Sequence, residues 1–520
     1  MFLKFKVIRF SPQKYLKLKR YTSNLENYNG IKIEKLIDLA EKDDPMALYE
    51  MGNKYNIGED GLERDDNLAM EYYSKSAELG NHFAMNMIGF KYLNNSKTLN
   101  KAIKYYEMAS ELGNISSSLS LGFLYYKGRL IKKNLTKAKF YLEKAAAQGD
   151  PIAIGKLGEI YLEEKEIEKG LEYLKISSEK GNHFSMASLG QLYELGKVVE
   201  KNLETALNYY TKAIEKGDNS FAIYKLGCFY EEGLVVGKDE AKAFEYYLRA
   251  ANNGLEMSFS SLAFMYLHGK GTPVNHEQAL IYFQKSAKVG NSHGYKNLAY
   301  MHENGYGTEK NFDLALYYYK EAAKRGDLLS INKLANCYEN GNGVEKDFQK
   351  AFRFYEIASK KGSDIATFKL AYFYETGRSV KKNIAKAIEL YKISFQEGNY
   401  IAANNLGNIY FSQEDYQNAI HYYQEASKLG SNESLKNLAV IYEFGLGVEK
   451  DLTLAFEYYK HAADKGNYLA LNKIGIMYEF GLGVEKDENL ALLYHQKAAT
   501  KGNVNSLKSI ETLKEKLKIF

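Results

Sequence analysis

The residues most suggestive of chemistry in this sequence are paired glycines that recur between apolar segments. Three such G-x-G triplets are Gly305–Gly307, Gly341–Gly343 and Gly445–Gly447. A dinucleotide-binding loop needs a preceding strand, a third glycine and an acidic residue about 20 positions later. Here each triplet follows a predicted helix and recurs at one position of a repeat. We therefore interpret the triplets as structural turns, and the sequence predicts no cofactor.

Histidines and cysteines form no pattern typical of a metal or nucleophile site. The nine histidines include no H-E-x-x-H motif, and none is paired with a cysteine. His82 and His183 share the segment G-N-H-F, whereas His302 stands where other repeats carry tyrosine, which predicts a packing role. Cys228 and Cys337 lie far apart at different repeat positions, which favours a reducing compartment. We predict no catalytic residue and no metal ligand, although a site built from distant repeats stays open.

Charge is concentrated at the start of the chain. The net charge is +5, and the first twenty residues carry seven Lys or Arg and no acidic residue, so the other 500 sum to about −2. The near-zero net charge of residues 21–520 argues against nucleic-acid binding. Residues 1–20 lack the uninterrupted apolar core of a secretory signal, and no apolar run is long enough to cross a membrane. We interpret them as a solvated basic tail, with organelle targeting as the alternative.

The elements that carry these residues are repeats closed by a glycine. The closing glycines are spaced 32 to 37 residues apart, which predicts about thirteen units. They are Gly80, Gly113, Gly149, Gly181, Gly217, Gly254, Gly290, Gly326, Gly362, Gly398, Gly430, Gly466 and Gly502.

Each unit contains two amphipathic helices. The first carries A-x-x-x-L-G-x-x-Y, as in Ala402–Tyr410, and the second A-x-x-Y-Y-x-x-A-A-x-x-G, as in Ala243–Gly254. These spacings place small and large residues along one helical face. We expect the glycine after the leucine to allow close approach of the helices, with tyrosine rings filling the wider part of the gap. That explains 46 tyrosines in a chain without tryptophan.

The residues at the helix ends agree with this pattern. We expect the closing glycine to adopt the left-handed conformation that ends a helix. The Asn or Asp after it, as at Asn81, Asp150 and Asn467, is predicted to cap the next helix. The loop between the helices, G-x-G-V-E-K-D at Gly445–Asp451, ends in a residue that caps the second helix.

The L-G-x-x-Y, G-x-G-V-x-x-D and Y-Y-x-x-A-A-x-x-G motifs resemble the SEL-one-like repeat, a tetratricopeptide-type family. The resemblance implies an all-α fold, a right-handed superhelical solenoid of about 13 helix-turn-helix repeats. Its predicted parts are a basic tail (1–30), an N-terminal capping helix (31–44), the array (45–503) and a C-terminal capping helix (504–520). Units closing at Gly113, Gly181 and Gly430 lack the long glycine loop, and the last is similar to an ordinary tetratricopeptide unit.

In the resembling families the first helices line a concave surface on which peptides or partner proteins lie. Carried onto this sequence, that register places Asn and Lys side chains there, able to bind a peptide backbone and carboxylates. The candidate residues are Lys296, Asn297, Asn332, Lys333, Asn336, Asn404, Asn405, Asn408, Lys436, Asn437, Asn472 and Lys473. The alternative is that these positions are only solvated. A second, acidic column comprises Glu231, Glu303, Glu339, Glu375, Glu443 and Glu479, and pairing with nearby lysines would make it structural.

The resemblance implies a non-enzymatic scaffold or adaptor that binds protein or peptide partners on its concave face, and we expect it to be cytoplasmic. Some similar proteins have been linked to β-lactam hydrolysis, but those carry cysteine pairs within each repeat, and this chain has none. A third hypothesis is an adaptor attached to a membrane surface through residues 1–20.

Overall fold

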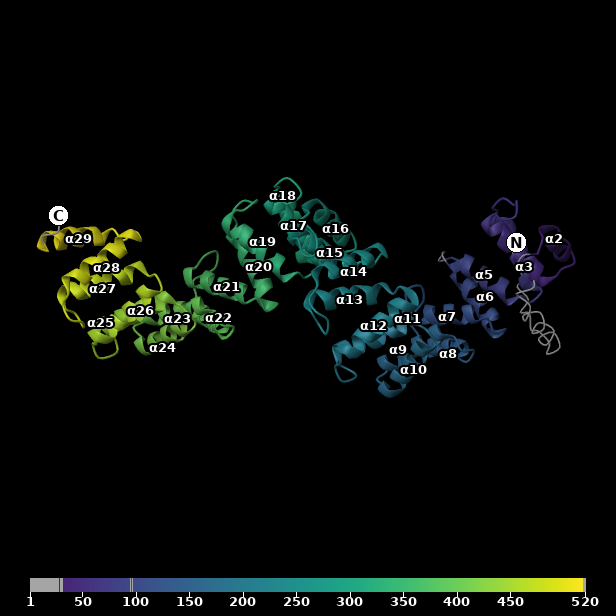
Figure 1. Cartoon of the computed structure of the whole chain (residues 1–520), viewed down its shortest axis with the longest axis horizontal. Helices are drawn as coiled ribbons and strands as arrows, with labels where there is room; N and C mark the ends of the chain where they lie inside the picture. The colour runs from purple at the N-terminus through teal and green to yellow at the C-terminus, as the bar shows by residue number, and fades with distance from the viewer. Residues whose placement is uncertain (1–27, 29–30, 94, 96, 518–520) are drawn as a thin grey trace. The chain divides into compact units, whose positions relative to one another are not determined.

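A computed structural model describes residue 28 and residues 31–93, 95 and 97–517. Within these residues the chain forms 28 helices and no strands, which confirms the predicted all-α repeat fold (Figure 1). No described helix is both long and apolar enough to span a membrane. The residues of the predicted basic tail lie outside the described part, apart from Tyr28.

Twenty-six of the helices form thirteen consecutive pairs, as the glycine spacing predicts. The first helices of the pairs are α3 (Pro45–Ile57), α5 (His82–Leu93), α7 (Ile115–Lys127), α9 (Pro151–Glu163), α11 (His183–Leu195), α13 (Ser220–Glu232), α15 (Met257–His268), α17 (Ser292–Asn304), α19 (Leu328–Asn340), α21 (Asp364–Thr376), α23 (Tyr400–Ser412), α25 (Asn432–Phe444) and α27 (Tyr468–Phe480).

Apart from the neighbours of α15, the second helices pack against their own first helix and against the helix that follows them. They are α4 (Asp66–Glu78), α6 (Leu99–Glu111), α8 (Leu135–Ala146), α10 (Ile167–Glu179), α12 (Leu203–Gly217), α14 (Glu240–Asn252), α16 (His276–Lys288), α18 (Phe312–Lys324), α20 (Phe348–Lys360), α22 (Ile384–Gln396), α24 (Tyr416–Lys428), α26 (Leu452–Asp464) and α28 (Glu488–Thr500). Single helices, α2 (Ile33–Glu41) and α29 (Asn505–Lys516), stand at the two ends of the array.

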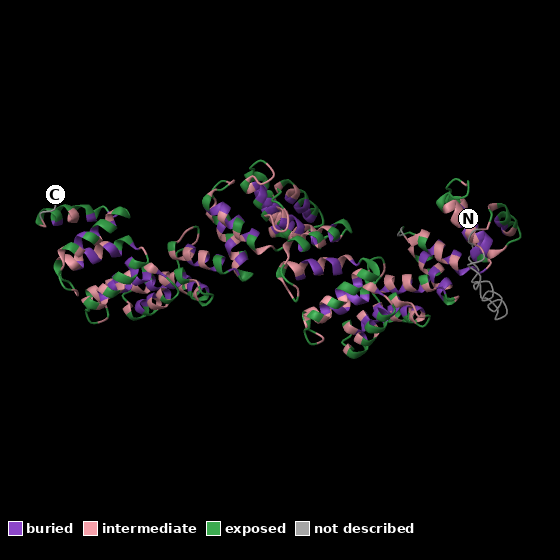
Figure 2. Cartoon of the chain, viewed as in Figure 1, coloured by how far each residue is buried: buried purple, intermediate pink, exposed green. Residues whose placement is uncertain are grey.

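The chain divides into two compact units, with the boundary inside the pair α15–α16. The first comprises residues up to Ser258 with Lys270–Thr272, and the second the remaining residues. In each unit the buried residues line the interfaces between helices, whereas the outward faces and the loops are exposed (Figure 2).

The core of each pair forms where a tyrosine of the second helix meets a glycine or alanine of the first. The Tyr247 ring is 1% exposed. A Cβ added to Gly227 would lie 2.7 Å from that ring, and one added to Gly407 would lie 2.5 Å from the Tyr423 ring. The glycine therefore makes room for the buried tyrosine ring itself.

Helix ends follow the predicted capping chemistry. The Asn81 and Asp150 side chains accept hydrogen bonds from backbone N–H groups in the first turn of the next helix, as do Asn467 and Asp451. Such caps satisfy donors that a helix leaves unpaired, so each turn is defined by its own residues.

One closing glycine departs from the prediction. Twelve of the thirteen have positive φ, but Gly217 stays in helix α12, and Asp218 takes the left-handed conformation at φ 47°. A Cβ on Gly217 would lie 2.2 Å from the His183 ring. The glycine is needed there because the histidine packs against it, not because of its backbone angle.

The G-x-G turns are contacts between neighbouring pairs. Gly483 has φ +68°, and a Cβ there would lie 2.1 Å from the Leu452 carbonyl oxygen at the start of the previous pair's second helix. Gly447 is similarly close to Tyr416, at 2.5 Å. The second glycine thus lets consecutive pairs approach closely, which supports the structural interpretation of these triplets.

Candidate partner-binding surface

Each first helix presents one outward stripe opposite a buried apolar residue, which is a leucine except at Met51, Ile88 and Ile474. Residues five before, one before, two after and six after that buried residue fall within a narrow arc at 100° per residue. In α19 they are Leu329, Lys333, Asn336 and Asn340, around the buried Leu334. We call this set of positions the first-helix stripe. The candidate residues two before the leucine, such as Asn332, lie at its edge.

A buried tyrosine hydroxyl supports the acidic column at the edge of the stripe. In six pairs a tyrosine of the second helix donates to a carboxylate of the first helix sixteen residues earlier. The pairs are Tyr210–Glu194 (2.5 Å), Tyr247–Glu231 (2.7 Å), Tyr319–Glu303 (2.6 Å), Tyr355–Glu339 (2.7 Å), Tyr391–Glu375 (2.6 Å) and Tyr459–Glu443 (2.6 Å). Burial, followed by the hydrogen bond to the carboxylate, raises the pKa of Tyr459. The tyrosine therefore remains a neutral donor.

Lysines from the next pair complete this arrangement in four places. They lie on the following first helix, 30 or 31 residues after the glutamate. The ion pairs are Lys225–Glu194 (2.8 Å), Lys333–Glu303 (3.4 Å), Lys369–Glu339 (3.1 Å) and Lys473–Glu443 (2.8 Å). The Tyr–Glu–Lys sets run from pair to pair, and we call them the polar ladder. Its lysines include two of the candidate binding residues, Lys333 and Lys473.

Three candidate asparagines bond to a serine of the next pair or, for Asn472, of the end helix α29. Asn332 Nδ2 donates to Ser363 Oγ at 2.9 Å. Asn404 accepts from the Ser434 hydroxyl at 2.8 Å, and Asn472 accepts from a third serine, Ser506, at 2.7 Å. These amides therefore link neighbouring pairs, although each retains donor or acceptor capacity.

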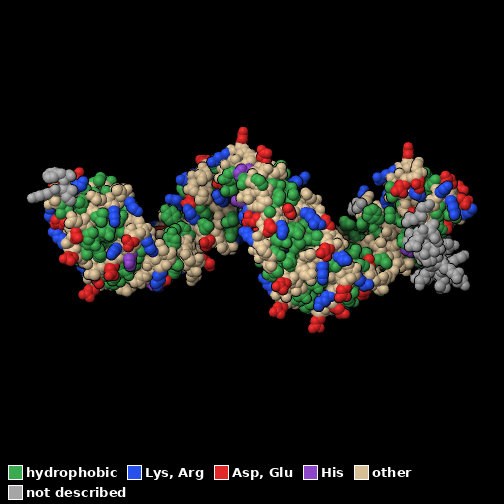
Figure 3. All heavy atoms as spheres, in the orientation of Figure 1, with side chains coloured by type: hydrophobic (Ala, Val, Ile, Leu, Met, Phe, Trp, Pro, Cys, Tyr) green, Lys and Arg blue, Asp and Glu red, His purple; other side chains and the backbone are tan. Residues whose placement is uncertain are grey.

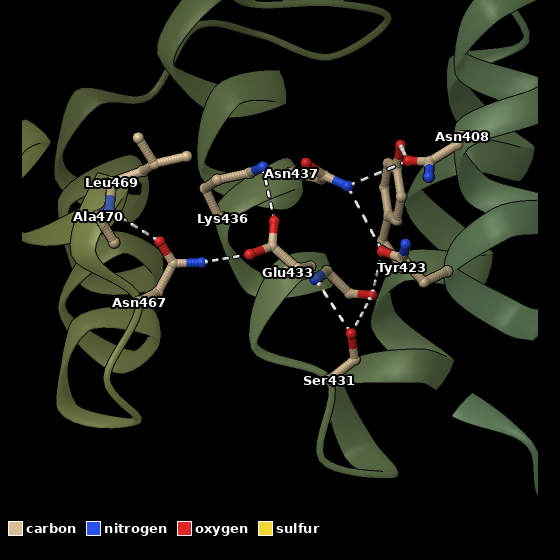
Figure 4. A network of polar contacts seen from close by, with 11 residues as sticks. Asn408, Tyr423, Ser431, Glu433, Lys436, Asn437, Asn467, Leu469 and Ala470 are labelled. Atoms are coloured by element: carbon tan, nitrogen blue, oxygen red, sulfur yellow. Dashed lines mark hydrogen bonds and ion pairs between the residues drawn. The ribbon is translucent and has the colours of Figure 1, made fainter. Parts of the chain in front are cut away.

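Around α23 and α25 the candidate asparagines contact one another (Figure 4). Asn408 Oδ1 accepts from the Tyr423 hydroxyl at 2.8 Å and from Asn437 Nδ2 at 3.2 Å. Asn405 Nδ2 donates to the Tyr391 hydroxyl at 3.1 Å. The cluster takes the place of charged ladder residues in this part of the chain.

The other candidate residues differ in whether their side chains already contact a partner within the chain. Lys436 forms an ion pair of 2.7 Å with Glu433 on its own helix. Asn336 lies beside the Tyr355 hydroxyl, whose pKa is raised mainly by burial. Lys296 and Asn297, both half-buried, have no hydrogen-bond or ion-pair partner among the described residues. No contact with a ligand tests these positions, so their role in binding stays a prediction.

The sequence reasoning missed large apolar side chains on the first-helix stripe. Leu329, Ile365 and Ile401 lie in the first turn of three successive first helices and are 57%, 53% and 45% exposed. Phe444 and Phe480 end α25 and α27 and are 61% and 63% exposed. The sequence signal for the first three was an apolar residue five positions before the repeat leucine, which already fills the core. Figure 3 shows apolar side chains reaching the surface between charged ones.

The described residues hold no cluster of three or more His, Cys, Asp or Glu side chains suited to a metal ion. Cys228 and Cys337 are both free. His302 is 6% exposed and stacks on Tyr318 with ring centroids 5.5 Å apart, so it fills the repeat tyrosine's place as predicted. The geometry of this surface therefore fits binding through polar and apolar contacts.

Comparison with known families identifies the repeats. The family model for the Sel1 repeat matches twelve segments between residues 45 and 503. They are residues 45–81, 83–114, 116–150, 152–182, 183–218, 220–255, 261–291, 292–327, 328–363, 364–399, 432–467 and 469–503. The family model for the tetratricopeptide repeat matches residues 400–432, which confirms the assignment of the unit closing at Gly430.

A solved structure of a similar chain shares the fold. The protective antigen c5321 of uropathogenic Escherichia coli, described as displaying an SLR fold, is 28% identical; the match covers 80% of this chain and 90% of that one, with a TM-score of 0.66. A Sel1 repeat protein from Oxalobacter formigenes is 24% identical over 70% of this chain and 94% of that one, with a TM-score of 0.41. No curated protein matches the chain.

Proposed function

The chain belongs to the Sel1 repeat family, whose members generally serve as protein–protein interaction scaffolds, and we propose that it is a scaffold or adaptor of this kind. In this proposal partner proteins or extended peptides bind along the first-helix stripe, on the concave face of the solenoid. The chain acts by holding partners in place and does not itself catalyse a reaction.

The observation that carries the proposal is the column of exposed apolar residues Leu329, Ile365 and Ile401. Burying half-exposed side chains of this size against a partner stabilises a complex by about 1 kcal/mol each. They lie beside asparagine amides that retain hydrogen-bonding capacity. A partner peptide could therefore bury apolar side chains and form backbone hydrogen bonds on the same surface. Extended chains bound through alternate side chains need both kinds of contact.

The predicted candidate residues take different parts in this proposal. Lys296 and Asn297 are available to a partner because they have no partner in the described structure. The ladder lysines Lys333 and Lys473 would instead hold the surface in shape, through ion pairs with the preceding pair. Two free thiols remain consistent with the cytoplasmic location we propose.

Affinity capture with matched variants tests this proposal. The stripe variant carries Leu329→Asp, Ile365→Asp and Ile401→Asp. The control carries Ile357→Asp and Ile393→Asp, which are 45% and 44% exposed on second helices of the same unit. Both variants are first checked for native helix content.

We expect the wild-type chain and the control to recover the same proteins from the source cells, and the stripe variant to lose them. Recovery that survives in the stripe variant but disappears in the control would place binding on the second helices and refute the proposal.

A further inference from the structure

The polar ladder contains a carboxylate that lacks its lysine. In the preceding pair Glu339 binds Lys369 at 3.1 Å, and two pairs further along Glu443 binds Lys473 at 2.8 Å. Glu375 occupies the same position on α21. No Lys, Arg or His side chain in the described part of the chain forms an ion pair with it.

The residue that stands in the lysine position is Asn405, thirty residues after Glu375. Its Nδ2 donates to the Tyr391 hydroxyl at 3.1 Å, and that hydroxyl donates to Glu375 Oε2 at 2.6 Å. Tyr391 is fully buried and holds the carboxylate in a fixed position. The carboxylate is therefore oriented by a hydrogen bond, while its charge is left without a counter-ion.

The next step of the ladder is neutral as well. Asn408 accepts the tyrosine hydrogen bond in place of a glutamate, Asn437 stands at the lysine position, and the two side chains are joined at 3.2 Å. Between Glu375 and Glu443 the ladder positions therefore carry no cation. This break coincides with the tetratricopeptide-type unit at residues 400–432, so it belongs to a distinct part of the array.

Exposed apolar side chains flank the break. Ile365 on α21 is 53% exposed and Ile401 on α23 is 45% exposed. Each lies on the stripe of its helix, as do Lys369 and Asn405 one turn further along. A partner lying across both helices would meet two apolar contacts and one unpaired carboxylate.

We infer that this part of the stripe binds an extended peptide segment carrying a lysine or arginine beside apolar residues. This inference rests on the proposed function and names the chemistry of its partner. The basic side chain takes the place of the missing ladder lysine at Glu375, and the apolar side chains contact Ile365 and Ile401. The Tyr391 hydrogen bond favours this because a carboxylate held in place loses little freedom when a cation binds.

Selection from a phage-displayed library of random 12-residue peptides on the full-length chain tests the inference. The consensus peptide is then synthesised with a fluorescein label, together with a version whose basic residues are glutamine. Binding is measured by fluorescence anisotropy to the wild-type chain, to Glu375→Gln and to Asn405→Lys. The second variant supplies a lysine at the position that Lys369 holds on α21 and Lys473 on α27. Glu443→Gln, at a glutamate that already has its lysine, is the matched control.

We expect basic residues in the consensus, and a loss of affinity of about fivefold in Glu375→Gln and Asn405→Lys but not in Glu443→Gln, as for one partly exposed ion pair. The glutamine peptide should bind all four proteins equally weakly. Neutral or acidic consensus peptides that lose binding on Ile365→Asp would refute the basic partner while leaving the binding surface intact. Peptides insensitive to Ile365→Asp would refute the proposed function itself, and no enrichment would refute both.

Discussion

The Tyr391 hydroxyl donates a hydrogen bond of 2.6 Å to the Glu375 carboxylate, sixteen residues earlier, and so joins the two helices of one repeat. The same bond recurs between Tyr459 and Glu443 at 2.6 Å. At the second site Lys473 also binds the glutamate, whereas among the described residues only Tyr391 binds Glu375. The same tyrosine–glutamate hydrogen bond is therefore supported by a lysine at Glu443 but not at Glu375.

The first prediction follows from that difference. Tyr391→Phe should destabilise the chain by about 1–2 kcal/mol, and Tyr459→Phe by about 0.5–1 kcal/mol. Removing the Tyr391 hydroxyl leaves both Glu375 and Asn405 without this bond, whereas Glu443 keeps its lysine. Urea denaturation followed by circular dichroism measures both. Equal losses would show that the lysine does not compensate.

The second prediction concerns the glycine that faces a buried tyrosine. Gly227→Ala should lower stability by about 1–2 kcal/mol, because the overpacking outweighs the better helix propensity of alanine. The new Cβ would lie 2.7 Å from the fully buried Tyr247 ring. Gly237→Ala is the control, since a Cβ there meets nothing within 4 Å. Thermal denaturation compares the two, and a midpoint unchanged in both would contradict this account of the interface.

The repeat units could be predicted from the sequence because each is defined by local chemistry. Asn383 caps its helix through its own side chain, and Gly227 follows its leucine in register, so spacing alone located both. The hydrogen bonds and ion pairs that the candidate side chains form within the chain could not be predicted in this way. Lys473 reaches Glu443 thirty residues earlier only because consecutive first helices stack at a particular height. The role of Gly217 could not be predicted either, because it depends on packing against His183 in the preceding first helix.

The third prediction tests whether the G-x-G turn joins neighbouring pairs. Gly483→Ala should destabilise by more than about 2 kcal/mol, because its Cβ would lie 2.1 Å from the Leu452 carbonyl oxygen. Gly430 also has a positive φ, +104°, but a Cβ there meets nothing within 4 Å, so Gly430→Ala should cost only the backbone strain of about 1 kcal/mol. Urea midpoints separate the two effects. Stabilisation of the wild-type chain by inorganic phosphate would instead support a phosphate-binding turn.

The fourth prediction concerns pH. Burial lowers the pKa of His82 from its ordinary 6.5 to about 4, so the folded chain keeps this ring neutral. The unfolded chain binds the proton below pH 6.5, and stability should therefore fall as the pH drops from 6.5 towards 4, by up to about 3 kcal/mol. His82→Ser, which introduces the residue found at Ser220 and Ser292, should flatten this dependence.

Urea midpoints at pH 7.5 and pH 5.0 measure the effect. His293→Ser, at an exposed histidine, is the control and should keep the wild-type dependence. Identical pH dependence in His82→Ser and the wild-type chain would show that another group is responsible.

The account rests on the claim that partners lie on the first-helix stripe, and site-specific photo-crosslinking in the source cells tests it most directly. Benzoylphenylalanine is placed at Asn297, which has no hydrogen-bond partner in the described structure, and in a separate chain at Ile357 on α20. We predict that Asn297 gives a cross-link to a defined protein, identified by mass spectrometry, and that Ile357 does not. Cross-links confined to Ile357 would contradict the central claim.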